Sequence, residues 1–226
     1  MKQENSLRGV IFDMDGVLCD SEPFIAEAAC RMFDELYQVK AFPSDFKPFI
    51  GTGEDRFIGG VAEKYGVRID LVAAKARVYA LYLEIIRGQL QPLAGAGEFM
   101  VACRKRGLKM AVATSADQIK LEGNLAQIRI PPSSFDVIVT GDAIKRKKPD
   151  PEVFLVAAAK LGLPAESCLV VEDAENGIMA GRAAGARCLG ITTTYEEERL
   201  KACGAEWTAP DLAHVPSHIP GVTSDA

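Results

Sequence analysis

Histidine and paired cysteine, on which many catalytic and zinc sites depend, are scarce in this chain of 226 residues. Its two histidines, His214 and His218, lie in a proline-containing tail, so we do not expect a mechanism based on histidine. None of the six cysteines forms a C-x-x-C pair, and none lies in a cysteine–histidine cluster with the spacing of a zinc site. We therefore expect free, reduced and largely buried thiols in a reducing compartment.

Positive charge and long apolar runs are also scarce. Lysine and arginine number 26 against 31 acidic residues, a net charge of −5, whereas a general nucleic-acid binder is expected to carry a basic excess. No apolar run approaches the roughly 20 residues of a transmembrane helix, and the polar residues 1–9 do not match a signal peptide. We expect no nucleic-acid or membrane partner and a cytoplasmic protein, or one of a reducing organelle stroma if a transit peptide was removed.

The apolar pattern that is present alternates between strand-like and helix-like segments. Short apolar runs predict buried strands at residues 10–12, 108–113, 137–139 and 168–171, with a weaker fifth at 186–191. Helical patterns separate them at residues 95–106, 116–128, 151–161 and 175–184. This alternation predicts an α/β fold, a doubly wound parallel sheet with helices on both faces.

The long gap after the first strand breaks this alternation. About 95 residues separate Asp13 from the second strand, whereas a β-α-β unit needs only about 30. The gap carries amphipathic helical patterns at residues 24–36, 57–65 and 71–86. We predict a helical cap domain of residues 20–91, inserted into an α/β core domain of residues 1–19 and 92–226.

Polar motifs follow the first four predicted strands. They are Asp13-Met14-Asp15-Gly16, Thr114-Ser115, Lys148-Pro149 in the polar loop after the third strand, and Glu172-Asp173. In open α/β sheets, ligands bind outside the carboxyl ends of the strands. We expect these carboxylates, hydroxyls and lysine to surround one site.

Each motif alone also has an interpretation without catalysis. Asp-x-Asp-Gly is common in turns and opens EF-hand calcium loops, but the twelfth position from Asp13 is Phe24, not the glutamate of such a loop. Thr114 is a typical helix cap, and Glu172 suits a helix N-terminus. The basic run 145–148 is typical of solvated surface charge. The occurrence of all four motifs in order favours catalysis.

The four motifs resemble those of the haloacid dehalogenase (HAD) superfamily, and the helical insertion resembles the cap of its β-phosphoglucomutase-like branch. The string Gly51-Thr52-Gly53-Glu54 also resembles the HAD domain of plant suppressor-of-quenching proteins. The resemblance implies a Rossmann-like core and a Mg²⁺-dependent phosphatase that acts on a small phosphorylated metabolite, such as a sugar phosphate. It is compatible with a monomer.

The resemblance also implies catalytic roles. Asp13 would attack phosphorus and form an aspartyl-phosphate, and Asp15 would first protonate the leaving oxygen and then deprotonate the attacking water. Thr114, with Ser115 as its substitute, would hydrogen-bond a phosphoryl oxygen. Lys148 would offset charge on the phosphoryl group and on the nucleophile.

A carboxylate can attack a dianionic phosphate ester only if the negative charge is offset, and Mg²⁺ with its hard oxygen ligands does this well. The resemblance implies ligation by Asp13, Asp173 and the backbone carbonyl of Asp15. Glu172 would be a further ligand or would accept a hydrogen bond from metal-bound water. Gly16 lies where backbone N–H groups can face the phosphate.

The cap loop bears on whether the reaction is hydrolysis or phosphoryl transfer between sugar hydroxyls. Gly51, Thr52, Glu54 and Arg56 are the candidate substrate contacts, although a plain turn at a helix entry is an equal alternative. A phosphomutase of this branch has a histidine where this chain has Ile25 and an arginine where it has Glu54, although Arg56 is close enough to substitute. A glutamate repels a second phosphate, so we predict a phosphatase, with a phosphomutase and a non-catalytic binding domain as alternatives.

Overall fold

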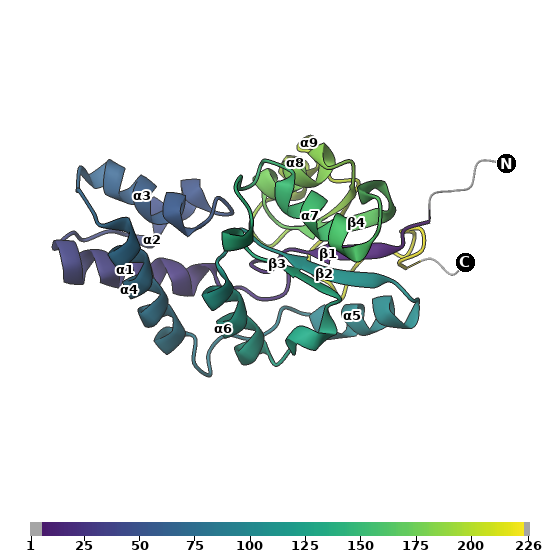
Figure 1. Cartoon of the computed structure of the whole chain (residues 1–226), viewed down its shortest axis with the longest axis horizontal. Helices are drawn as coiled ribbons and strands as arrows, with labels where there is room; N and C mark the ends of the chain where they lie inside the picture. The colour runs from purple at the N-terminus through teal and green to yellow at the C-terminus, as the bar shows by residue number, and fades with distance from the viewer. Residues whose placement is uncertain (1–5, 224–226) are drawn as a thin grey trace.

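The computed structural model describes residues 6–223, and the outer ends of the expected core domain, 1–5 and 224–226, lie outside this range. Six parallel strands form one sheet in the order β3-β2-β1-β4-β5-β6. They are β1 Gly9–Phe12, β2 Lys109–Ala113, β3 Val137–Val139, β4 Cys168–Glu172, β5 Arg187–Ile191 and β6 Trp207–Ala209. Figure 1 labels four of them, with helices such as α5 (Ala96–Lys105) and α7 (Glu152–Leu161) packed around the sheet. The parallel sheet and its first five strands are confirmed, whereas β6 was not predicted.

Side chains alternate between the two faces of the sheet, and each face is covered by helices. On one face Val10 and Phe12 of β1 pack into a core with Phe99 of α5, and on the other Ile11 packs with Phe154 of α7. The helices of the core are α5 Ala96–Lys105, α6 Gln118–Ile128, α7 Glu152–Leu161, α8 Glu175–Ala183 and α9 Glu197–Ala202. Short 3-10 turns lie at η2 Pro132–Ser134, η3 Gly141–Ala143 and η4 Ala165–Ser167.

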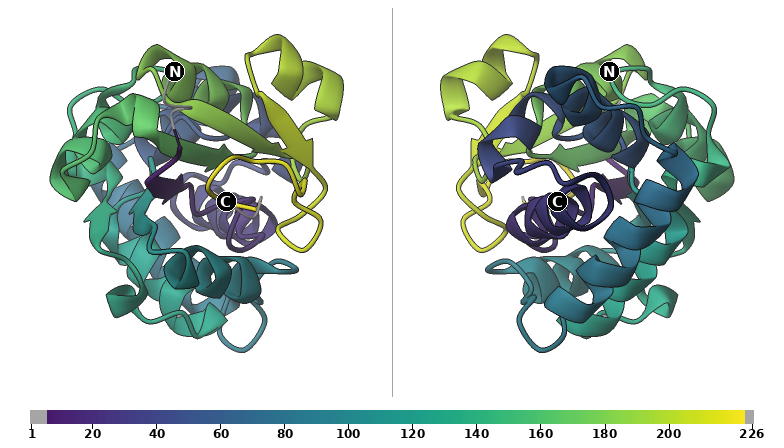
Figure 2. Two further views of the ribbon diagram at one scale, coloured as in Figure 1. Left: turned by 90° about the vertical axis from the view of Figure 1, so that its right-hand side faces the viewer. Right: turned by 90° about the vertical axis from the view of Figure 1, so that its left-hand side faces the viewer.

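The insertion after β1 is helical. It contains α1 Glu22–Tyr37, α2 Pro43–Phe46, the 3-10 turn η1 Lys47–Phe49, α3 Glu54–Tyr65 and α4 Leu71–Ile85. Helices α1 and α4 pack side by side, and the group lies beyond one end of the sheet (Figures 1 and 2). Asp70 begins α4 by accepting hydrogen bonds from the backbone N–H groups of Val72 and Ala73, both at 3.1 Å.

The chain crosses between the sheet and the helical insertion twice, and the two crossings are joined. Cys19 pairs with Pro92 in an antiparallel bridge, and the N–H of Leu93 donates to the carbonyl of Leu18 at 2.9 Å. Two adjacent crossings of this kind can act together as a hinge. We keep residues 20–91 as the proposed extent of the cap.

The helices and the cysteines bear on two expectations from the sequence, the absence of a membrane partner and the presence of free thiols. Within residues 6–223, none of the helices combines the length and the apolar character needed to cross a membrane. All six cysteines are free, and four of them, Cys19, Cys103, Cys168 and Cys188, are buried. The expectation of free and largely buried thiols is therefore confirmed.

Candidate active site

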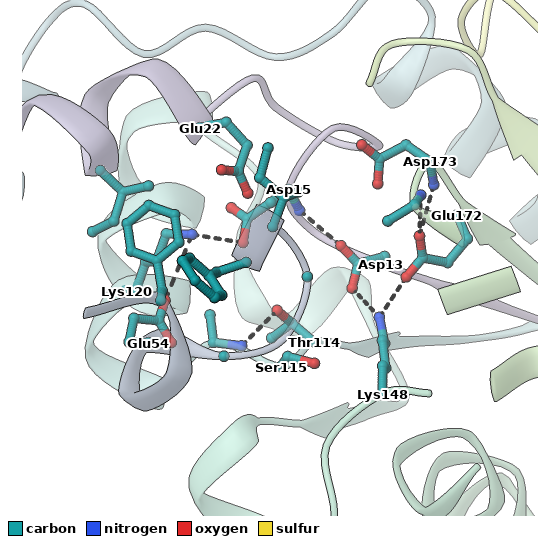
Figure 3. A pocket seen from close by; sticks show the side chains of 18 residues that line it. Asp13, Asp15, Glu22, Glu54, Thr114, Ser115, Lys120, Lys148, Glu172 and Asp173 are labelled. Carbon is teal, nitrogen blue, oxygen red and sulfur yellow. Dashed lines mark hydrogen bonds and ion pairs between the residues drawn. The ribbon is translucent and has the colours of Figure 1, made fainter. Parts of the chain in front are cut away.

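The polar motifs meet in one pocket between the carboxyl ends of the strands and the cap (Figure 3). Strands β1, β2 and β4 run parallel and in adjacent register, so the residues that follow them emerge at the same edge. The pocket is lined by Asp13, Asp15, Thr114, Ser115, Lys148, Glu172 and Asp173 from the core, and by Gly51, Gly53 and Glu54 from the cap loop.

Lys148 is buried between two carboxylates. Its Nζ donates to Asp13 Oδ1 at 2.5 Å and to Glu172 Oε1 at 2.7 Å, and lies 4.8 Å from the ring centroid of Phe154. Burial alone would lower the pKa of Lys148, but the charges of Asp13 and Glu172 outweigh burial and raise it. Lys148 therefore stays cationic and directs positive charge at Asp13.

Asp13 and Asp173 are buried carboxyl groups with too little positive charge around them. Burial raises the pKa of Asp13 to about 7; Lys148 opposes this rise, and the charges of Glu172 and Asp15 add to it. Burial, with the charges of Glu172 and Asp13, raises the pKa of Asp173 well above its ordinary value. Thr194 donates a hydrogen bond to Asp173 Oδ2, but no lysine or arginine among residues 6–223 pairs with this carboxyl group.

The chemistry of these donors fits a hard divalent cation. Six carboxyl groups line the pocket, those of Asp13, Asp15, Glu22, Glu54, Glu172 and Asp173, against two lysines, Lys120 and Lys148. Over the described part of the chain, no three acidic, histidine or cysteine side chains are arranged to hold a metal ion as they stand. The excess of buried carboxylate oxygen nevertheless calls for a cation, and oxygen is the ligand that Mg²⁺ prefers.

Gly16 lets the loop after β1 approach the loop after β4. Its φ is +74°, and a Cβ at this position would lie 1.9 Å from Asp173 Oδ2. Any other residue would displace the carboxyl group of Asp173. Gly16 therefore lets the two carboxylate motifs lie together. Its N–H donates to the carbonyl of Cys19 at 2.7 Å, and Gly16 is not among the residues that line the pocket, so the expected contact of this N–H with the phosphate is not seen.

The adjacent residues Thr114 and Ser115 line the same pocket as Lys148 and carry hydroxyl groups. Thr114 Oγ1 accepts a hydrogen bond from the N–H of Ala116 at 3.0 Å, and a hydroxyl that accepts one hydrogen bond can still donate another. Ser115 Oγ is buried and has no partner among the described residues. Both hydroxyls therefore have a hydrogen to donate to a ligand, so Thr114 can cap the turn and still bind a phosphoryl oxygen.

Sequence reasoning missed the side chains that hold Asp15. Lys120 Nζ donates to Asp15 Oδ2 at 2.7 Å, Asn124 Nδ2 donates to Asp15 Oδ1 at 3.1 Å, and Ser21 also donates to Oδ1. Lys120 and Asn124 lie one turn apart on the buried face of α6, in line with Ile128. Two polar residues four positions apart on an otherwise apolar helix face were the feature of the sequence that could have indicated a buried polar contact here.

The cap loop approaches this cluster. Glu54, at the start of α3, is buried with its Oε1 at 3.8 Å from Lys120 Nζ, while its Oε2 has no hydrogen-bond partner within the described range. Glu22, at the start of α1, also lines the pocket, and burial raises its pKa to about 7 although Lys120 lowers it. A second link joins cap to core, because Lys75 of α4 pairs with Asp117 of the core at 2.8 Å.

Two of the expected cap contacts are not among the residues that line the pocket. Thr52 Oγ1 donates to the carbonyl of Phe49 at 2.7 Å. The guanidinium of Arg56 donates to both carboxylate oxygens of Glu63, at 2.9 and 2.8 Å, and lies 5.0 Å from the ring centroid of Phe49. The local partners Phe49 and Glu63 hold these two side chains, so the structure does not bring Thr52 and Arg56 to the site.

The chain matches the family model of haloacid dehalogenase-like hydrolases over residues 7–185. It is 42% identical over 212 residues to the chloroplastic protein Suppressor of Quenching 1 of Arabidopsis thaliana, which is 91% of this chain but only 20% of that protein. It is 31% identical over 180 residues to a phosphorylated carbohydrates phosphatase of Thermotoga maritima, covering 79% of this chain and 82% of that enzyme. A hydrolase from Pseudomonas syringae superposes with a TM-score of 0.84 at 27% identity, covering 96% of this chain and all of that one.

Proposed function

The chain belongs to the haloacid dehalogenase-like hydrolases, and on this basis we propose that it hydrolyses a small phosphorylated metabolite with Mg²⁺, through an aspartyl-phosphate on Asp13. The family and its named phosphatases identify the chain as a phosphatase. The metal, the intermediate and the sugar-phosphate-like substrate are our proposal. The observation that carries it is the meeting of Asp13, Lys148 and the hydroxyls of residues 114 and 115 in one buried pocket.

The first chemical step is assigned to Asp13 and Lys148. A carboxylate oxygen of Asp13 forms the bond to phosphorus as the bond to the leaving oxygen breaks, and Asp15 gives that oxygen a proton. Lys148 offsets charge on the phosphoryl group, while Thr114 and Ser115 donate hydrogen bonds to its oxygens. The products of this step are a neutral alcohol and a phosphorylated Asp13.

The second step returns the enzyme to its starting state. Asp15, now a carboxylate, removes a proton from the water that attacks phosphorus; the bond between phosphorus and the Asp13 oxygen breaks, and inorganic phosphate leaves. Lys120 and Asn124 keep the carboxyl group of Asp15 in place through both steps, because their contacts to its two oxygens fix its orientation.

A bound Mg²⁺ would be held by Asp13, Asp173 and the backbone carbonyl of Asp15, with Glu172 as a further ligand or second acceptor, and would neutralise charge on the phosphate and the nucleophile. Glu172 already accepts from Lys148 and from the backbone N–H groups of Asp173 and Ala174, both at 2.8 Å. These contacts favour its role as an acceptor that orients its neighbours.

Hydrolysis is better supported than mutase chemistry. A phosphomutase must bind a second phosphate, and in this chain Ile25 and Glu54 line the pocket where that branch carries histidine and arginine. Arg56, the possible substitute, is paired with Glu63. The assembled catalytic side chains argue against a non-catalytic binding domain.

Release of inorganic phosphate from an aryl phosphate tests the proposed function. The wild-type chain should turn over with Mg²⁺, and Asp13→Asn should lose activity by several orders of magnitude because an amide is a poor nucleophile. Asp34→Asn, on an exposed position of α1, is the matched control and should keep wild-type activity. Equal activity of Asp13→Asn and the control would refute the proposal.

We also propose a compartment and an oligomeric state for the protein. Six free thiols support a reducing compartment, cytoplasm or organelle stroma. The lining residues of the pocket include the full set of proposed catalytic side chains of this chain, so the proposed reaction does not require a residue from a second copy, which is compatible with the proposed monomer.

A further inference from the structure

The pocket extends past the phosphate-binding side chains toward the cap, where a leaving group must lie. Phosphate chemistry occupies the side of the pocket at Asp13, Lys148 and Thr114. On the other side lie Glu22 and Glu54 (Figure 3). We call these two residues and the apolar side chains that the cap adds to the pocket lining, Ile25, Phe49 and Phe57, the cap-side subsite. The carboxylates and apolar side chains of this subsite are placed to contact the leaving group of the substrate.

One polar atom of the cap-side subsite is left for a ligand. Glu54 is 6% exposed, and its Oε2 has no hydrogen-bond partner within the described range, although Oε1 lies 3.8 Å from Lys120 Nζ. A buried carboxylate oxygen without a partner is costly, and a donor on the ligand would relieve that cost. The buried hydroxyl of Tyr79 on α4 lies near Glu54 but, like Oε2, has no hydrogen-bond partner within residues 6–223, so a donor on the ligand is the partner that Oε2 lacks.

Among residues 6–223, each lysine or arginine near the cap-side subsite already has a partner, so none is left for an anionic leaving group. Lys120, the lysine that reaches this side, already donates to Asp15 Oδ2 at 2.7 Å. Arg56 pairs with Glu63, and Lys147 Nζ donates to the carbonyl of Ser115 at 3.2 Å without lining the pocket. A carboxylate or second phosphate on the substrate would therefore meet carboxylates without compensation.

We propose that the cap-side subsite selects phosphate monoesters whose leaving group carries hydroxyl or amino hydrogen-bond donors and no second anionic group. Glu54 and Glu22 accept hydrogen bonds from these donors, and Ile25, Phe49 and Phe57 pack against the carbon skeleton. This proposal rests on the proposed phosphatase function. It adds a class of leaving group that is accepted and a class, the anionic leaving groups, that is rejected.

Matched pairs of substrates test the selection by kcat/KM. Glucose 6-phosphate should exceed 6-phosphogluconate, and glycerol 3-phosphate should exceed 3-phosphoglycerate, each by about tenfold or more, because like charges in a buried site repel strongly. Glucosamine 6-phosphate, compared with glucose 6-phosphate, tells whether an amine or a hydroxyl is the better donor. Equal or faster hydrolysis of the anionic member of both pairs would overturn the proposal.

Variants assign the selection to its residues. Glu54→Gln keeps the shape and removes the charge, so the preference for the neutral member should fall about tenfold. Glu84→Gln, at an exposed position of the cap helix α4, is the matched control and should leave the preference unchanged. Glu22→Gln is the second variant, and it should also lower the preference for the neutral substrate. An unchanged preference in both pocket variants would refute the role of these carboxylates.

Aryl phosphate separates a failure of this proposal from a failure of the proposed function. Aryl phosphate turnover without hydrolysis of any neutral polyol or amino phosphate would overturn the substrate class and leave the phosphatase function standing. Absence of aryl phosphate turnover in the folded wild-type chain would instead refute the proposed function.

Discussion

Replacing Lys120 by methionine tests the buried charge cluster that holds Asp15. Lys120 is 3% exposed and places one ammonium between Asp15 Oδ2, at 2.7 Å, and Glu54 Oε1, at 3.8 Å. Methionine keeps most of the apolar stem and removes the charge. Two buried carboxyl groups then face each other without a cation, and removal of one partner of a buried ion pair costs about 3–5 kcal/mol. We expect the lower end, because Asn124 and Ser21 still donate to Asp15.

The loss of stability in Lys120→Met should depend on pH, and the direction of this dependence can be worked out. Burial raises the pKa of Glu54 although Lys120 lowers it, so the loss of Lys120 raises this pKa further. A carboxyl group with a higher pKa in the folded state binds more protons folded than unfolded, so stability falls as pH rises through that window. The deficit of Lys120→Met against wild type should therefore be larger at about pH 8 than at about pH 5.

Urea unfolding at both pH values, followed by the fluorescence of the single tryptophan, Trp207, measures this deficit. Lys201→Met removes a lysine from an exposed i,i+4 pair and should change the free energy of unfolding by less than about 1 kcal/mol. The kcat for aryl phosphate should fall about 10- to 100-fold in Lys120→Met, less than the roughly 100- to 10,000-fold of a whole acid–base group, because Asn124 and Ser21 still orient Asp15. A deficit below about 1 kcal/mol at both pH values, or a larger deficit at pH 5, would refute the reasoning.

Two further predictions concern the cap and the carboxylates of the pocket. Gly59→Ala should stabilise the protein by up to about 1 kcal/mol because its Cβ meets open space in α3, whereas Gly60→Ala should destabilise it by about 1–3 kcal/mol because its Cβ would lie 2.3 Å from Phe49 Cζ. Thermal unfolding compares the two, and equal shifts would contradict this packing. Metal-free protein should lose stability as pH rises from about 5 to 8, because the pKa of Asp13 is raised to about 7 and that of Asp173 is raised as well. Mg²⁺ should remove most of this loss of Tm, and a Tm independent of pH in EDTA would contradict the account.

Much of the core was predictable because its signals are local. Short apolar runs such as residues 168–171 mark buried parallel strands, and Asp13, Thr114 and Glu172 directly follow such runs. Once strands are parallel, their carboxyl ends share an edge, so the position in sequence predicts the position in space. Strand β6 was missed because Trp207–Ala209 has only three residues and a polar one, Thr208, at its centre.

Other parts of the site depend on contacts between residues far apart in sequence. Lys120 looks like a solvated helix residue until Asp15, 105 residues away, is placed beside it. Arg56 was expected at the pocket from its distance along the chain, but a count of residues does not give side-chain direction, and Glu63 holds it elsewhere. Whether a charged side chain is buried, and which way it points, depends on the packed structure. The periodicity of apolar residues in the sequence does not determine either property.

Capture of the phosphorylated enzyme tests the central claim most directly. With an aryl phosphate, whose leaving group needs little help from an acid, Asp15→Asn should still be phosphorylated but should hydrolyse the intermediate slowly. Rapid quenching and peptide mass spectrometry should find one phosphoryl group on Asp13. Phosphate release from this variant with a phosphoryl group on another residue, or with none at any time, would contradict the account.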